Sequence, residues 1–254
     1  MKIVTWNVNS VRARLPHVED FLKDHQPDVL LLQELKCEKH AFPLSLEEFG
    51  YNCAVFGQKT YNGVAILSKF PIEDVQIGIP NFEDASSRYI EAFTNGVRVV
   101  SVYVPNGQEI DSAAYMYKLN FFQALYNHAQ YLLTLDEQIV IGGDFNVAPT
   151  DDDVYNPMLW KNQVLCSTRE REAFRKIVYA GFTDAIAQST QGPMPYTWWN
   201  YRQGAFAKDG GLRIDHLLLS PQAADSLNTT TVHRYMRGLE KASDHAPVEV
   251  TLKN

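Results

Sequence analysis

The segment Gly142-Gly143-Asp144-Phe145-Asn146 follows directly on the apolar, β-branched run Ile139-Val140-Ile141. Such a run predicts a buried strand, and the two glycines let the backbone leave that strand sharply. Side chains alternate along an extended segment, so Asp144 and Asn146 are expected to point to the same face. A carboxylate can hold a cation or accept a proton, while an amide both donates and accepts hydrogen bonds. Taken alone, the pair also fits an Asx-turn that closes a strand.

The same arrangement recurs at other strand ends, where oxygen-bearing or imidazole side chains adjoin an apolar run. These are Asn7 and Asn9 after residues 3–6, Gln33 and Glu34 after 29–32, Tyr103 and Pro105-Asn106 after 99–102, Asp215 and His216 after 212–214, and Asp244 and His245 before 247–250. Strands lying side by side would gather these groups at one rim of a sheet. Clustered acids repel unless a cation or a reaction offsets the repulsion. The set therefore predicts a functional rim.

Periodicity predicts three helices and a series of short strands. One helix follows Asn9 with Val11, Leu15, Val18 and Leu22 on one face and Pro16 in its first turn. A second spans residues 113–133, where the apolar spacing predicts a buried face of Tyr115, Leu119, Phe122, Tyr126, Ala129 and Leu133, and a third spans about 169–180. Further strand candidates are 51–56, 63–68, 89–94, 97–103, 196–201, 213–219, 231–236 and 247–252. The pair Asn95-Gly96 predicts a hairpin turn. We expect an α/β fold with two mixed sheets packed face to face and helices outside.

Composition predicts a compact protein in a reducing compartment. The 254 residues, of which 45% are hydrophobic, can bury a large core, and neither a linker nor a repeat is visible, so we expect one domain over 1–254. The N-terminal apolar run is too short for a signal peptide, and no segment approaches the ~20 apolar residues of a membrane span. The three cysteines, Cys37, Cys53 and Cys166, form no paired motif. We expect a monomeric cytoplasmic protein with no membrane partner.

Net charge leaves the partner open. The formal charge is −7 and the pI about 5.5, which does not suggest a polyanion-binding protein. Basic residues nevertheless lie close to the polar strand-end segments, among them Arg12, Arg14, Lys36, Arg88 and Arg213. A bound divalent cation would offset part of the negative balance. Charge alone therefore does not decide whether the partner is a nucleic acid.

The rim residues predict phosphoester hydrolysis. Carboxylate and amide oxygens suit Mg²⁺ or Mn²⁺ rather than zinc, and Glu34, Asp144, Asp244, Asn7 and Asn9 supply them. His245 is then expected to donate a hydrogen bond to phosphate, with Asp215 fixing its tautomer. Neither a serine nucleophile elbow nor a P-loop is present, so water activated by Asp144 is the expected nucleophile, with Asn146 orienting the water or the phosphate.

Six segments together resemble the exonuclease III family of apurinic/apyrimidinic endonucleases, within the wider DNase I-like fold. They are Trp6-Asn7-Val8-Asn9, Leu32-Gln33-Glu34-Leu35-Lys36-Cys37, Tyr103-Val104-Pro105-Asn106, Gly142-Gly143-Asp144-Phe145-Asn146, Gly211-Leu212-Arg213-Ile214-Asp215 and Ser243-Asp244-His245-Ala246-Pro247. They run in the family's order from Lys2 to about Val250. The resemblance implies a four-layered α/β sandwich, with DNA lying across the rim.

The resemblance also implies roles for the site residues. Glu34 would be the main metal ligand, with Asn7 nearby and Asp244 at a second position; Tyr103 would contact the scissile phosphate; Asp144 and Asn146 would prepare the water; and the Asp215–His245 pair would stabilise phosphate charge. Trp198 would line the pocket for a flipped abasic sugar. Core packing is the alternative role for Trp198 and Trp199, and one of the two is expected in the core. Further DNA contacts are expected from Tyr61, Asn62, Arg88, Asn106 and Arg12.

The chain also departs from the family pattern at three positions. Asn9, Leu212 and Glu109 stand where some members carry aspartate, an aromatic residue and arginine. We expect Mg²⁺-dependent cleavage 5′ to abasic sites in duplex DNA. The enzyme could also act on blocked 3′ ends as a 3′-phosphodiesterase, 3′-phosphatase or exonuclease. Because of the three departures, the relative strength of these activities stays open. A phosphoesterase of the same fold acting on inositol phosphate, RNA or sphingomyelin, and a catalytically silent nucleic-acid-binding module, remain as alternatives. DNA binding would associate the protein with the nucleoid of a bacterial-type cell.

Overall fold

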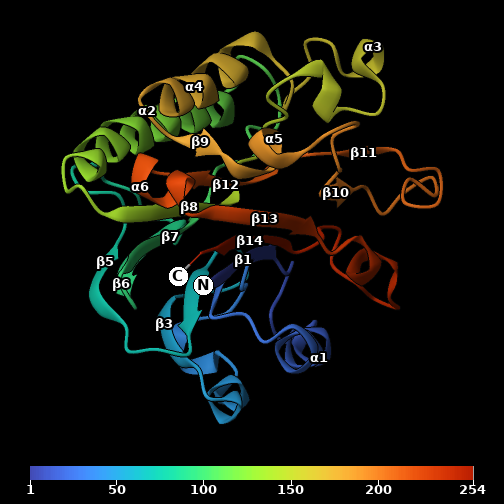
Figure 1. The fold of residues 1–254 in the computed structure, drawn as a ribbon. Coiled ribbons are helices and arrows are strands. Elements are labelled where there is room, and N and C mark those ends of the chain that lie inside the picture. The colour runs from blue at the N-terminus through green and yellow to red at the C-terminus, as the bar shows by residue number, and fades with distance from the viewer. Residues whose placement is uncertain (254) are drawn as a thin grey trace.

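The computed structural model describes residues 1–253 and contains two six-stranded mixed sheets (Figure 1). The first sheet comprises β1 (Lys2–Asn7), β2 (Val29–Gln33), β3 (Asn52–Phe56), β4 (Val64–Ser68), β13 (Leu227–Val232) and β14 (Val248–Leu252), in the order β13-β14-β1-β2-β4-β3. The second comprises β5 (Glu73–Ile77), β6 (Tyr89–Thr94), β7 (Val97–Tyr103), β8 (Gln138–Asp144), β9 (Thr183–Asp184) and β12 (Asp215–Leu219), in the order β5-β6-β7-β8-β12-β9. A two-stranded piece pairs β10 (Trp198–Trp199) with β11 (Gly211–Leu212).

Helices cover the outer face of each sheet. The α-helices are α1 (Leu15–His25), α2 (Ala113–Leu133), α3 (Pro157–Trp160), α4 (Thr168–Tyr179), α5 (Ala185–Ser189) and α6 (Pro221–Asp225); the 3₁₀ segments are η1 (Lys39–Ala41), η2 (Leu44–Phe49), η3 (Asp151–Asp153) and η4 (Arg234–Gly238). In Figure 1, α2 and α4 lie on one side of the molecule and α1 on the other. The expected four-layered sandwich is confirmed.

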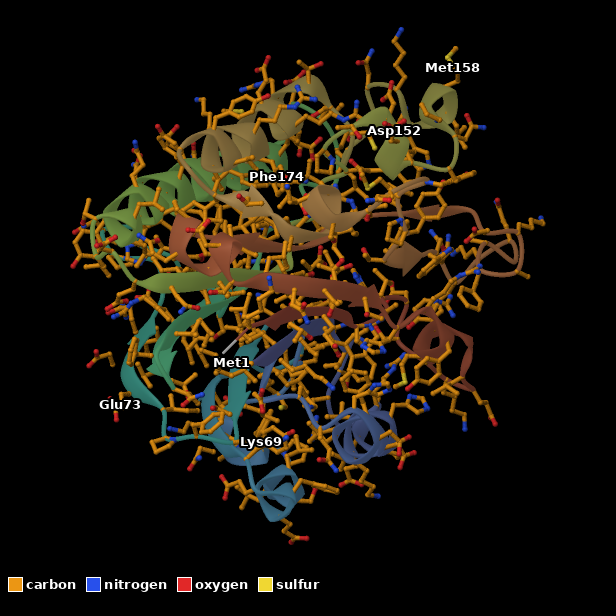
Figure 2. All side chains as sticks on the ribbon, viewed as in Figure 1. Met1, Lys69, Glu73, Asp152, Met158 and Phe174 are labelled. Atoms are coloured by element: carbon orange, nitrogen blue, oxygen red, sulfur yellow. The ribbon has the colours of Figure 1, made fainter. Side chains whose placement is uncertain are left out.

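Three apolar clusters correspond to the three interfaces between these layers. Between the sheets, β1, β2 and β4 contribute residues such as Ile3 and Leu31, which meet Val99 and Leu217 of the second sheet. Phe122 of α2 and Phe174 of α4 pack on the outer face of the second sheet, and Figure 2 shows Phe174 beneath its helix. A third cluster places α1 on the outer face of the first sheet. This burial holds both sheets in a fixed relation at the rim.

Close contact between the sheets also has a polar component. Gln33, fully buried at the end of β2, donates a hydrogen bond from Nε2 to Oγ of Ser101 in β7 at 2.9 Å. Ser101 Oγ in turn donates to the carbonyl of Leu32 at 2.9 Å. A Cβ atom added at Gly142 would lie 2.7 Å from a methyl group of Leu31, so glycine permits this close approach. These contacts join the sheets directly below the rim.

Most predicted elements are present, and the main differences concern weakly apolar segments. The Asn95-Gly96 hairpin between β6 and β7 is confirmed, with φ of 47° and 80°. The strand predicted at 231–236 is wrong: β13 ends at Val232 and residues 234–238 form η4. The predicted strand 196–201 shrinks to two residues. The edge strand β5, exposed along its whole length, lacks the alternation that marks a half-buried strand.

The buried face of α2 differs from the predicted one. Its bounds are those predicted, but Leu119, Tyr126 and Leu133 are only partly buried. The most buried positions are instead Tyr115, Lys118, Phe121, Phe122, Leu125, His128, Ala129 and Leu132. A charged Lys118 in this face is invisible to a search for apolar spacing. Within residues 1–253, no helix combines the length and apolar character that crossing a membrane requires.

Candidate active site

The polar strand ends converge because the strands that carry them are neighbours. Tyr103 at the end of β7 pairs in register with Asp144 at the end of parallel β8, and Asp144 pairs with Asp215 at the start of antiparallel β12. In the first sheet, Asn7 at the end of β1 pairs with Gln33, the residue before Glu34. Ser243 donates from Oγ to the carbonyl of Asn7 at 2.7 Å, which fixes the segment that carries His245. The predicted rim therefore exists.

At the centre of the rim, His245 lies between two carboxylates. Its Nδ1 is 2.9 Å from Oδ2 of Asp215, and its Nε2 is 3.7 Å from Oδ2 of Asp144. Burial alone would lower the pKa of His245, but the charges of Asp215 and Asp144 outweigh burial and raise the pKa to about 10. The ring is therefore an imidazolium at neutral pH, and both of its nitrogens are donors.

Asp215 is held in place by Thr197. The Thr197 hydroxyl donates to Oδ2 of Asp215 at 2.6 Å and accepts from the Asp215 main-chain N–H at 3.1 Å. Both residues are fully buried. Because the carboxylate is fixed from two directions, it holds the imidazole ring of His245 in one orientation. Thr197 is thus a positioning residue that the sequence patterns did not indicate.

Asp144 is a buried carboxyl with a raised pKa. Burial raises the pKa of Asp144 to about 7; Asp215 and Glu34 add to the rise, while the charge of His245 opposes it. The main-chain N–H of Asn146 donates to Oδ1 of Asp144 at 2.8 Å. A carboxyl with a pKa near neutrality can both take up and release a proton, which is what a general base requires.

Asn7 joins the two acidic strand ends. Its Nδ2 donates to Oε1 of Glu34 at 2.9 Å and to Oδ2 of Asp144 at 3.0 Å. Glu34 itself has a left-handed φ of 53°, and its other oxygen forms an ion pair with Lys36 at 2.8 Å. The sharp turn after β2 thus directs the Glu34 side chain across the rim toward Asp144.

The donor set around Glu34 fits a hard divalent cation. One ligand atom each from Glu34, Asp144 and His245 lies within 4.8 Å of the others. As an imidazolium, His245 has no lone pair to offer, which leaves the carboxylate oxygens of Glu34 and Asp144 as the possible ligating atoms. Asn7 turns its Nδ2 toward both carboxylates, and its Oδ1 accepts from the main-chain N–H of Asn9 at 3.0 Å. Oxygen ligands of this kind suit Mg²⁺ or Mn²⁺. Glu34 lies beside Asp144 at this rim, and the roles of Glu34 and Asn7 as metal ligands stay predictions.

Asp244 has a different environment from the one predicted for a ligand. Its Oδ1 accepts from Nδ2 of Asn9 at 2.9 Å, and its Oδ2 accepts from Nε1 of Trp198 at 3.0 Å. Burial would raise the pKa of Asp244, but His245 and these two hydrogen bonds lower it. The carboxylate therefore anchors Trp198 beside the rim, and its role as a second metal ligand stays a prediction.

Asn146 lies in a tight turn after β8 and not in an extended strand. β8 ends at Asp144, and Asn146 has a left-handed φ of 50°, so the expected alternation of side chains does not apply. The tight turn nevertheless returns the amide to the rim: Nδ2 donates to the carbonyl of Val104 at 2.9 Å, and Oδ1 accepts from Nδ2 of Asn106 at 3.1 Å. Asparagine tolerates this backbone conformation better than most residues.

Two charged side chains support the rim from either side. Fully buried Lys118 donates from Nζ to the carbonyls of Asn146 at 2.6 Å and Asn106 at 3.1 Å, and forms an ion pair with Glu170. The guanidinium of Arg88 lies 4.6 Å from the ring centre of Tyr103. Burial, followed by the carboxylates of Glu34 and Asp144, raises the pKa of Tyr103 well above its ordinary value, so the phenol stays a donor.

Comparison with known proteins assigns this chain to a family. The model of the Endonuclease/Exonuclease/phosphatase family matches residues 4–245. The chain belongs to this family. Exodeoxyribonuclease III of Haemophilus influenzae is 31% identical over the full length of both chains. Among solved structures, the 3′ phosphatase NExo from Neisseria, bound to a product DNA hairpin, has a TM-score of 0.98 and 43% identity, and an AP endonuclease from Archaeoglobus fulgidus has 0.97 and 37%, each with complete coverage of both chains.

The resemblance to the exonuclease III family is therefore confirmed. These relatives are nucleases, so the chain is a phosphodiesterase of the endonuclease/exonuclease/phosphatase fold. The predicted enzyme class thus holds, and a family of divalent-metal-dependent enzymes fits the carboxylates at the rim. Membership of an enzyme family argues against the alternative of a catalytically silent nucleic-acid-binding module.

The rim adjoins a cavity whose wall includes two tryptophans. The cavity has a volume of about 350 Å³, and its lining includes Trp198, Trp160, Leu165, Asn106 and Glu109. Trp198 and Trp160 meet edge to face with ring centres 6.5 Å apart. Trp199 is fully buried and belongs to the core, so it is Trp198 that is available to a ligand.

The other predicted DNA contacts divide into two groups. A second hollow of about 400 Å³ has a lining that includes Tyr61, Asn62, Arg88, Tyr103 and Asn106. Tyr61 is 68% exposed, whereas Asn62 is buried and donates to Gln58 within its own loop. Arg12 is exposed before α1. Of the two arginines there, Arg14 contacts the site: it donates to the carbonyl of Asn9 at 2.6 Å and to the hydroxyl of Tyr201 at 3.1 Å.

Proposed function

We propose that this enzyme cleaves duplex DNA on the 5′ side of abasic sites in a Mg²⁺-dependent reaction. The observation that carries the proposal is the cationic His245, which faces Asp144 across 3.7 Å at the edge of a rim flanked by the Trp198 cavity. The facing pair of His245 and Asp144 suits a phosphodiester. The Trp198 cavity suits an extrahelical sugar without a base, because such a sugar presents an apolar face to an aromatic wall.

The side chains divide the chemistry between them. Asp144, with a pKa near 7, accepts a proton from the attacking water, and Asn146 helps to orient that water. As the water oxygen bonds to phosphorus, the P–O3′ bond breaks, and the departing 3′ oxygen takes up a proton to leave as a hydroxyl. His245 donates to a phosphoryl oxygen through Nε2 while Asp215 holds its Nδ1, so charge that develops on phosphate meets a fixed cation. Tyr103 donates to the same phosphate. Mg²⁺, held by Glu34 with Asn7 beside it, would supply a Lewis acid for the phosphoryl group.

A second candidate function is processing of blocked 3′ ends with little abasic incision. The specific observation in its favour is the 43% identity to the Neisseria 3′ phosphatase, against 37% to the archaeal AP endonuclease. Glu109, an exposed acid in the lining of the Trp198 cavity, would also repel a DNA phosphate there. The same catalytic groups serve both reactions, so only the choice of substrate differs.

Two duplexes run in parallel test the proposal. One carries a single abasic analogue and the other a 3′-phosphate at a nick; each is incubated with Mg²⁺, with EDTA, and with the variants Asp144→Asn and Asp225→Asn. We expect incision of the first duplex with Mg²⁺ only, loss of incision in Asp144→Asn, and no change in Asp225→Asn, where an exposed carboxyl at the end of α6 is altered. Removal of the 3′-phosphate without incision would favour the second function.

We infer a monomer of one domain that acts in the cytoplasm on nucleoid DNA. Support comes from the bacterial relatives and from the free cysteines Cys37, Cys53 and Cys166, which suit a reducing compartment. Because DNA contact at the rim would release counterions, affinity should fall steeply as salt rises, despite the net charge of −7.

A further inference from the structure

A second group of potential metal ligands lies on the outer face of the first sheet. His25 is the last residue of α1, His233 follows β13, and Glu249 lies within β14. The side chains of Val248 and Val250 belong to the core between the sheets, so the alternation along β14 turns Glu249 toward the layer that contains α1. One ligand atom from each of the three residues lies within 4.8 Å of the others.

Contacts with neighbouring groups fix the orientation of all three side chains. His233 Nε2 is 3.0 Å from Oε2 of Glu249, and the rings of His25 and His233 meet at a steep angle with centres 4.3 Å apart. Phe21 stacks on His25 at 4.5 Å and meets His233 edge-on at 5.1 Å. The hydroxyl of Tyr235 lies 2.7 Å from Nε2 of His25, in the manner of an outer partner that orients a ligand.

The charge balance at the cluster is compatible with a cation. Burial, followed by the nearby His233, lowers the pKa of His25, so its imidazole keeps a free lone pair at neutral pH. The carbonyl end of α1 adds partial negative charge beside His25. Burial alone would raise the pKa of Glu249, but the hydrogen bond with His233, followed by the charge of Lys2, lowers it, so Glu249 is a carboxylate at neutral pH. The positive charge of Lys2, which donates from Nζ to the carbonyl of His25 at 2.7 Å, opposes a cation.

We propose that His25, His233 and Glu249 form a second metal site, for Zn²⁺ or a similar divalent transition metal. Two imidazoles and one carboxylate are ligands that zinc prefers, and the three leave a fourth position for water. This donor set differs from the oxygen-rich set at Glu34, which suits Mg²⁺, so the two sites select different metals. A bound ion would join the end of α1 to β13 and β14.

The test uses the full chain with its active site disabled. In the variant Glu34→Gln/Asp144→Asn, Zn²⁺ is titrated calorimetrically and thermal unfolding is followed with and without the ion. We expect one Zn²⁺ per chain and a Zn²⁺-dependent rise in Tm, because a ligand that binds only the folded state stabilises it. Co²⁺ bound in its place should show visible absorption bands of four-coordinate geometry.

Single changes in this background then identify the ligands. His25→Ala and Glu249→Gln should each weaken Zn²⁺ affinity at least about 100-fold, and Tyr235→Phe about tenfold, since loss of an outer partner costs less than loss of a ligand. His40→Ala, at an exposed histidine in η1, is the matched control and should bind normally. Absence of binding in the disabled background, or unchanged binding in both His25→Ala and Glu249→Gln, overturns the proposal; either result would leave only a His233–Glu249 hydrogen bond. Nuclease activity with Mg²⁺ tests the active site independently.

Discussion

The ammonium nitrogen of Lys118 lies 2.6 Å from the main-chain oxygen of Asn146, in a fully buried ion pair with Glu170. The same nitrogen donates to the carbonyl of Asn106 at 3.1 Å. Glu170 also accepts from the main-chain N–H of Leu165 at 3.0 Å, so the pair ties the turn after β8 to two segments that line the Trp198 cavity. One buried charge thereby sets the position of Asn146 and Asn106, the groups proposed to orient the water and to contact DNA.

Replacing Lys118 with methionine should reduce both stability and turnover. Because Glu170 would keep a buried charge without its partner, we expect the free energy of unfolding to fall by about 3–5 kcal/mol. Displacement of Asn146 should lower kcat more than it changes KM. Urea unfolding and steady-state kinetics measure the two effects, and the double variant Lys118→Met/Glu170→Gln should recover part of the stability. Lys176→Met, at an exposed position of α4, is the control. A destabilised variant with normal kcat would limit Lys118 to a structural role.

Removing the charge of Asp215 should act through His245. Asp215 is the strongest of the charges that raise the pKa of His245, so Asp215→Asn should move that pKa down from about 10. With less imidazolium to face the phosphate, kcat should fall by about 100- to 10,000-fold. A histidine titration by NMR, together with kcat at several pH values, checks both effects. An unchanged titration of His245 would contradict the assignment, and Asp225→Asn should leave both quantities as in the wild type.

The fold could be predicted wherever burial leaves a clear pattern. The runs that became β1, β2, β7 and β8 are apolar because both sheet faces are covered, and the 113–133 helix was found with its bounds. The patterns failed for β13, whose Thr-rich sequence lies partly exposed at a sheet edge, and for β5. At such edges packing constrains few side chains, so composition and periodicity carry little information.

For the site, sequence order showed which residues adjoin strand ends but not which of them touch. Asp144 and Asp215 converge as predicted because β8 and β12 pair in register, and the hydrogen bond from Ser243 to the carbonyl of Asn7 brings the segment of His245 beside them. The supporting residues Lys118, Thr197 and Arg14 act through main-chain and hydroxyl contacts between distant segments. No local motif records such contacts. The turn at Asn146 likewise depends on a positive φ that an extended reading could not anticipate.

Acid should destabilise the fold through the ion pairs beneath the rim. Buried Arg213 donates to Asp153 at 2.6 Å and to Asp184 at 2.7 Å. Burial alone would raise the pKa of Asp184, but Arg213 and His216 outweigh burial and hold that pKa well below its usual range. A carboxyl with a depressed folded-state pKa stabilises the protein above its unfolded pKa of about 3.9, and this stabilisation is lost as pH falls from there toward the folded value.

Urea midpoints between pH 3 and pH 7 measure this effect. We expect the wild-type midpoint to fall steeply below about pH 4, and Asp184→Asn to show a lower midpoint at pH 7 with a shallower acid slope. Asp20→Asn, where an exposed carboxyl 3.7 Å from Lys23 is altered, should follow the wild-type curve because surface pairs contribute little. Equal acid slopes in wild type and Asp184→Asn would remove Asp184 from the explanation.

Trp198 should separate the two candidate reactions. If its ring forms a wall of the abasic pocket, Trp198→Ala should reduce incision at an abasic analogue by at least about tenfold, as loss of one base-stacking aromatic does, while removal of a 3′-phosphate changes less. Trp198→Phe keeps an aromatic wall and removes only the hydrogen bond to Asp244, so it should retain most of the incision. Single-turnover assays on both duplexes supply the rates. Equal losses on both substrates in Trp198→Ala would mean that Trp198 acts by anchoring Asp244 rather than by contacting the sugar.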